Sequence, residues 1–125
     1  MSTLAVVIVD HGSRRDEANT AFLEVVRRFA DSSRFAIVEP AHMELASPTI
    51  DDAFARAVAR GAGRIVVHPY FLLPGRHYAE DIPAQCDAAS RKHGNVSWLI
   101  TAPLSESPVL LEAIEECVDA VLEDD

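Results

Sequence analysis

Apolar residues form four short runs along the chain, each about as long as one β-strand. The runs cover residues 4–9, 35–38, 64–70 and 96–102, and they are nearly continuous instead of alternating with polar residues. Continuous runs rich in Val, Ile and Leu are typical of strands that are buried on both faces of a parallel sheet. The pattern therefore predicts four buried strands.

A helical pattern follows each run, and the third of these helices is expected to end near Gly94. Ser47-Pro48 and Ser107-Pro108 predict two helix starts, each with Ser as the N-cap and Pro at the first helical position. Apolar residues three or four positions apart give each helix a stripe that faces a core. The clearest stripes are Phe22, Val25, Val26 and Phe29; Ile50, Ala53, Phe54, Ala57 and Val58; and Leu110, Ile114, Cys117, Val118 and Val121.

Regular alternation of strand and helix predicts an α/β fold of three layers. Such a fold has right-handed crossovers and helices on both faces of a parallel sheet. We expect a flavodoxin-like, four-stranded sheet with the strand order 2-1-3-4. The 125 residues match the common size of one domain, so we expect a single domain over residues 1–125.

Composition and charge narrow the function classes. The chain is 49% hydrophobic and 25% charged, and its formal net charge of −9 opposes binding to nucleic acid or anionic membranes. No apolar stretch approaches the ~20 residues that cross a bilayer, and no basic region precedes the first apolar run, so we expect a cytoplasmic protein. Cys86 and Cys117 form no C-x-x-C pair, which favours buried free thiols in a reducing compartment.

Histidines and carboxylates follow the strands where ligands bind in such a fold, at the carboxyl edge of the sheet. His11 comes after the first run, His42 and Glu44 follow the second, and His77 follows the third. Neutral imidazole is a good ligand for Fe²⁺, Co²⁺, Ni²⁺ or Zn²⁺ and accepts a proton near neutral pH. No H-x-x-x-H, H-E-x-x-H or C-x-x-C spacing is present, so spacing alone identifies no class of metalloprotein.

Longer motifs give a more specific resemblance. The segments D-H-G-S-R-R at residues 10–15 with Asn19, E-P-A-H-M-E-L-A-S-P at 39–48, P-Y-F-L-L-P-G-R-H-Y-A-E-D-I-P at 69–83 and T-A-P-L at 101–104 resemble the small class II tetrapyrrole chelatases. The resemblance runs over nearly the whole chain. It is strongest to the sirohydrochlorin ferrochelatases of the sirohaem pathway, with the sirohydrochlorin cobaltochelatases as near relatives.

The resemblance implies a metal chelatase, a lyase that inserts Fe²⁺ into sirohydrochlorin without ATP and gives sirohaem. It assigns the central chemistry to His11 and His77, and expects Glu44 to hold or deliver the metal. His42 resembles the ferrochelatase branch and is a further candidate metal ligand. The metal is a substrate, no tightly bound cofactor is expected, and the family's short members imply a homodimer.

The charges near these motifs fit a tetrapyrrole that carries many carboxylates. Arg14, Arg15 and Arg76 lie beside the motif histidines, and they offer local positive charge and bidentate pairing in an acidic chain. Ser13, next to the start of the first helix, adds hydrogen-bond donors. We therefore expect these four residues to bind the substrate.

Other functions stay open from the residues alone. Cobalt or nickel insertion is one, because the ligands do not enforce the choice of metal. A non-enzymatic carrier of metal or tetrapyrrole on the same scaffold is another. A protoporphyrin ferrochelatase is disfavoured because a chain with 6% aromatic residues offers little to line an apolar cleft. His68 is expected to be a hydrogen-bonded histidine of the core or of an interface, and His93 to be exposed or to stabilise the end of a helix.

Overall fold

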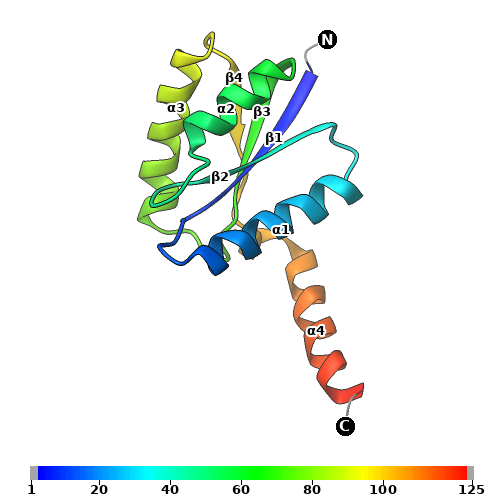
Figure 1. Cartoon of the computed structure of the whole chain (residues 1–125). Helices are drawn as coiled ribbons and strands as arrows, with labels where there is room; N and C mark the ends of the chain where they lie inside the picture. Colours follow the sequence, from blue (N-terminus) through cyan, green and yellow to red (C-terminus); the bar gives the residue numbers. More distant parts are fainter. Residues whose placement is uncertain (1–2, 124–125) are drawn as a thin grey trace.

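The computed structural model describes residues 3–123, without the side chains of His77 and Tyr78. Four parallel strands form one sheet in the order β2-β1-β3-β4, as the sequence predicts. The strands are β1 (Thr3–Asp10), β2 (Ile37–His42), β3 (Ala62–Pro69) and β4 (Ser97–Ile100). Figure 1 shows β1 and β3 at the centre of the sheet.

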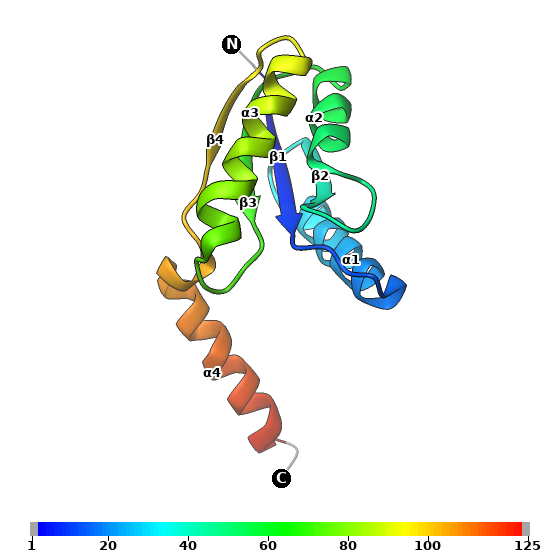
Figure 2. The same cartoon turned by 90° about the vertical axis from the view of Figure 1, so that its left-hand side faces the viewer.

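Helices pack on both faces of this sheet. α1 (Asp16–Ser32) lies on one face, and α2 (Ile50–Ala59) and α3 (Ile82–Lys92) lie together on the other (Figure 2). Successive residues of β1 point to opposite faces, so Val7 and Val9 pack with α2 and α3, whereas Val6 and Ile8 pack with α1. Two apolar cores result, one on each side of the sheet.

Some boundaries differ from the prediction. β2 begins two residues later than expected and continues to His42, paired with β1 throughout, so the second strand reaches the carboxyl edge itself. α2 does not begin at Ser47-Pro48. Its N-cap is Thr49, whose hydroxyl accepts from the Asp52 backbone N–H while the Asp52 carboxylate accepts from the Thr49 N–H. This reciprocal capping box explains why the helix starts later.

The last helix, α4 (Pro108–Glu123), begins at the predicted proline but leaves the domain. Figures 1 and 2 show it extending beyond the carboxyl edge of the sheet. None of its residues is buried, and its apolar stripe faces solvent. Cys117 is therefore exposed, contrary to the prediction, whereas Cys86 in α3 is buried as expected. Within residues 3–123 no helix is both long and apolar enough to cross a membrane.

Candidate active site

The candidate site lies where β1 and β2 end side by side. Asp10 pairs with His42 in the sheet, and the backbone pairing continues past both strands. The Met43 N–H donates to the Asp10 carbonyl at 2.8 Å, and the Glu44 N–H donates to the His11 carbonyl at 3.1 Å. These bonds hold the two connections together and place His11 beside Glu44.

His11 and Glu44 form a pair that is open to solvent. His11 Nε2 lies 3.4 Å from Glu44 Oε1, and the two side chains are 45% and 49% exposed. The other ring nitrogen, Nδ1, lies 3.3 Å from the Gly12 carbonyl oxygen. An imidazole and a carboxylate at this distance combine one nitrogen and one oxygen ligand, which suits a divalent metal that is bound briefly and then released.

Gly12 makes the close approach of the two connections possible. Its φ is +92°, and a Cβ built on it would lie 1.9 Å from the Glu44 carbonyl oxygen. A side chain is therefore excluded by both backbone conformation and space. The glycine of the H-G-S motif is required by the position of Glu44 on the neighbouring connection.

Ser13 closes the turn that leads into α1. Its backbone N–H and carbonyl both pair with the Asn19 side chain, at 3.0 and 2.8 Å. Its hydroxyl accepts from the Arg15 N–H at 3.0 Å, so the hydroxyl already supports the turn. Arg14, Arg15 and Arg76 are exposed, and among the described residues no ion pair joins them to a carboxylate.

His42 lies beneath this edge and not on it. The side chain is fully buried, and Nδ1 lies 2.6 Å from Asp10 Oδ1, so the Nδ1–H group donates a hydrogen bond to the carboxylate. The ring also packs against Phe22, with 5.4 Å between ring centroids. Nε2 is buried, and no hydrogen-bond partner for it exists among the described residues. Its predicted role as a metal ligand stays a prediction.

His77 begins a short π-helical turn, His77–Asp81, directly before α3. Its side chain is outside the described part of the structure, so its predicted role also stays a prediction. The connection that carries it starts beside β1, since the Tyr70 N–H donates to the Val9 carbonyl at 2.6 Å. Among the described side chains, no three His, Cys, Asp or Glu residues converge on a metal site.

Comparison with known proteins agrees with the fold and with the family resemblance. The CbiX family model matches residues 5–121. The chain belongs to the CbiX family. The match includes most of α4 of this CbiX protein.

Three relatives of this CbiX protein show how far the similarity extends. The sirohydrochlorin ferrochelatase of Arabidopsis thaliana, named as chloroplastic, is 47% identical over 94% of this chain and 52% of its own length. The sirohydrochlorin cobaltochelatase of Sulfolobus acidocaldarius is 30% identical over 95% of this chain and 93% of its own. A CbiX protein structure from Marinobacter aquaeolei is 30% identical, with a TM-score of 0.84 over 98% and 99% of the two chains. The chain thus spans about half the length of the Arabidopsis protein.

Two polar residues of this edge had no role assigned from the sequence. Asp10 fixes His42, and Asn19 closes the turn at Ser13. The sequence places Asp10 directly after the apolar run 4–9 and Asn19 six residues beyond Ser13, and these positions could have marked both residues as polar groups near the candidate site. Only the register of β1 against β2 shows that Asp10 meets His42.

Proposed function

We propose that this protein is a sirohydrochlorin ferrochelatase that inserts Fe²⁺ into sirohydrochlorin without ATP, giving sirohaem. The observation that supports this most is the open pair of His11 Nε2 and Glu44 Oε1, 3.4 Å apart, within the residues that the family model matches. The ferrochelatase name of the Arabidopsis relative favours iron.

In the proposed reaction, M²⁺ enters the macrocycle as two pyrrole N–H protons leave. We propose that His11 holds the incoming metal and accepts one of the two protons after the metal has left it, and that the Glu44 carboxylate offsets the charge of the ion. His77 is proposed as the second imidazole, and His42 as a further ligand. Ser13, Arg14, Arg15 and Arg76 are proposed to bind the substrate's carboxylates.

The second candidate is cobalt or nickel insertion by the same residues. The cobaltochelatase name of the Sulfolobus relative, which matches this chain over nearly its full length, favours cobalt. An imidazole and a carboxylate do not discriminate between these ions, so the metal available in the cell would determine which one is inserted. A non-enzymatic carrier of metal or tetrapyrrole on this fold is the remaining alternative. We propose further that the protein is a cytoplasmic homodimer with no tightly bound cofactor.

The test is anaerobic incubation of the protein with sirohydrochlorin and Fe²⁺, Co²⁺ or Ni²⁺, followed by absorption. Insertion faster than in protein-free solution is expected, and the ranking of rates identifies the metal. His11→Ala and Glu44→Gln should each lower the rate at least tenfold, about 1.4 kcal/mol of barrier. His93→Ala, which changes a histidine outside this edge, is the matched control. No acceleration with any metal, together with tight binding of metal, would favour the carrier.

A further inference from the structure

Leu45, directly after Glu44, has a backbone conformation that leucine rarely adopts. Its φ is +73°, in the left-handed region, where the Cβ of a bulky residue crowds the neighbouring carbonyl oxygen. Among residues 3–123, Asn95 is the other non-glycine residue with a positive φ, and asparagine tolerates this region far better. Leu45 is therefore a strained position, and it lies beside the candidate site.

Contacts of the neighbouring backbone hold Leu45 in this conformation. The Glu44 N–H donates to the His11 carbonyl at 3.1 Å, and the Glu44 carbonyl oxygen lies against Gly12, 1.9 Å from where a Cβ would be. The peptide that joins Glu44 to Leu45 is thus fixed in place. The chain then returns to the end of β2, since the His42 N–H donates to the Pro48 carbonyl at 2.7 Å.

This reversal of the chain does not itself need a leucine. Glycine or asparagine adopts a left-handed backbone with little strain, and turns ordinarily carry one of them at such a position. Leu45 is 53% exposed, so packing within the chain offsets its strain only in part. Strain that is kept where another residue would fold more easily is characteristic of functional sites.

Two further exposed leucines lie on the other side of His11. Leu72 and Leu73, in the connection after β3, are 62% and 71% exposed. Because β1 lies between β2 and β3, this connection and the one that carries Leu45 leave the sheet on opposite sides of His11. The backbone at Leu72 is fixed, since its carbonyl accepts from the Ser105 N–H at 3.0 Å. Exposed apolar side chains thus flank His11 on both sides, as at a binding surface.

The substrate of the proposed reaction has a surface that matches this arrangement. A tetrapyrrole macrocycle is flat and has two apolar faces, and sirohydrochlorin adds carboxylates around the rim. The exposed Arg14, Arg15 and Arg76 suit the carboxylates of the rim. The exposed leucines supply the apolar surface that a macrocycle face needs.

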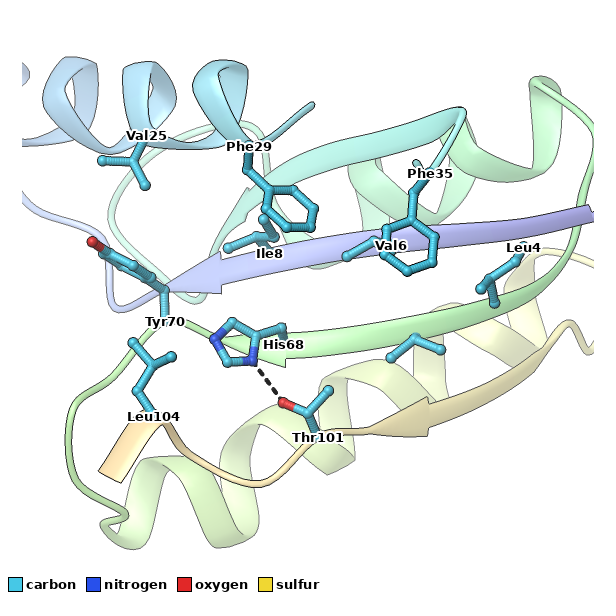
Figure 3. Close-up of a pocket in the computed structure, with 11 residues that line it drawn as sticks. Leu4, Val6, Ile8, Val25, Phe29, Phe35, His68, Tyr70, Thr101 and Leu104 are labelled. Carbon is cyan, nitrogen blue, oxygen red and sulfur yellow. Dashed lines mark hydrogen bonds between the residues drawn. The ribbon is translucent and has the colours of Figure 1, made fainter. Parts of the chain in front are cut away.

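The largest apolar groove of the described residues suits this substrate less well. It has a volume of about 450 Å³ and lies on the sheet face that carries α1, with Leu4, Val25 and Phe29 in its lining (Figure 3). None of the described residues that line it is Arg or Lys. Its imidazole, His68, is already hydrogen-bonded to the Thr101 hydroxyl at 2.7 Å. The groove therefore offers no cation for the substrate's carboxylates.

We propose that Leu45 packs against a face of the macrocycle during metal insertion, with Leu72 and Leu73 supporting the ring on the other side of His11. This contact fixes the ring nitrogens relative to His11 and Glu44, so Leu45 positions the substrate. The strained backbone of Leu45 is the cost of an apolar side chain at this place. The inference rests on the proposed function for the identity of the tetrapyrrole, but not on which metal is inserted.

The test is the affinity for metal-free sirohydrochlorin, measured anaerobically by absorption titration. Leu45→Asn introduces a residue that tolerates the left-handed backbone, with a polar side chain of similar size. About half of Leu45 is exposed, so burying the rest against the ring corresponds to roughly fivefold to tenfold in affinity. The dissociation constant of Leu45→Asn should rise by that factor. Leu45→Met keeps an apolar side chain and should stay within about twofold of wild type.

Urea unfolding separates this contact from an effect on folding. Because asparagine relieves the backbone strain, Leu45→Asn should unfold at the same or a higher urea concentration than wild type. Weaker binding without lower stability is a result that a purely structural role of Leu45 does not give. Leu23→Asn is the matched control, because it makes the same change at an exposed leucine in the middle of α1. It should leave the affinity for sirohydrochlorin unchanged.

A second variant leaves the turn at Leu45 intact. Leu72→Asn/Leu73→Asn changes the apolar residues on the other side of His11, and it should also raise the dissociation constant. Wild-type affinity in Leu45→Asn would overturn the proposal, and so would an equal loss of affinity in Leu23→Asn.

Metal insertion by wild type is measured separately, so the two proposals can fail independently. If wild type binds sirohydrochlorin but inserts no metal, the proposed function is wrong, and the comparison of Leu45→Asn with Leu45→Met still decides the contact. If wild type does not bind sirohydrochlorin, the contact is refuted as well.

Discussion

Gly12→Ala is the substitution whose effect follows most directly from the structure. The new Cβ would lie 1.9 Å from the Glu44 carbonyl oxygen, and φ at this position is +92°. A left-handed backbone costs a non-glycine residue about 1–2 kcal/mol. Relieving the clash requires the connections after β1 and β2 to separate, which weakens the bonds Met43 N–H to Asp10 carbonyl and Glu44 N–H to His11 carbonyl.

The total cost can be worked out from these contributions. Each of the two hydrogen bonds contributes about 0.5–1.5 kcal/mol. Together with the backbone strain, Gly12→Ala should lose about 2–5 kcal/mol, a large part of a typical total stability of ~5–15 kcal/mol. Metal insertion should fall as well, because the movement displaces Glu44 from its position 3.4 Å from His11.

The assay is urea unfolding combined with the insertion rate, and the chain provides two matched controls. Gly94 has φ +75° with no atom within 4 Å of a built Cβ, so Gly94→Ala adds strain without a clash. Gly75 has open space and no left-handed backbone, so Gly75→Ala should be nearly neutral. If Gly12→Ala lost no more stability than Gly94→Ala and kept full insertion, the close approach would not be what holds Glu44 in place.

Three further substitutions or measurements test the fold. Thr49→Ala removes the capping box of α2 and should cost about 1 kcal/mol in urea unfolding, whereas Ser47→Ala should cost less. Burial raises the pKa of the Cys86 thiol to about 12, so Cys86 should react with a thiol reagent only as fast as the protein unfolds. Burial lowers the pKa of His68, so the unfolded chain protonates first and stability should fall as the pH drops below about 6.5. His68→Gln should reduce that fall; an unchanged pH profile would contradict the assignment.

The strand order and the position of the site were predictable because they depend on periodicity and topology. Continuous apolar runs predicted buried parallel strands, and the carboxyl edge then selected His11, His42, Glu44 and His77, of which the structure brings the side chains of His11 and Glu44 together. The start of α2 was predicted wrongly, since two adjacent cap candidates competed and the reciprocal bonds of Thr49 and Asp52 prevailed over Ser47-Pro48. The exposure of Cys117 was also missed, because an apolar stripe predicts an amphipathic helix but not whether the domain of the same chain covers its apolar face.

The sequence could not separate the roles of His11 and His42, and the structure does so through burial. Both follow a strand at the same edge, yet His11 is open to solvent beside Glu44, whereas His42 is enclosed and fixed by Asp10. A reaction that must release its metal needs weak, accessible ligands, and it also needs them held in place. The pair of partly exposed Asp10 and fully buried His42 is suited to the second requirement because it ties β1 to β2 just before the turn that carries His11. On this argument, weakening the Asp10–His42 pair should shift His11 and Glu44 from their positions, in addition to any effect on a metal bound by His42 itself.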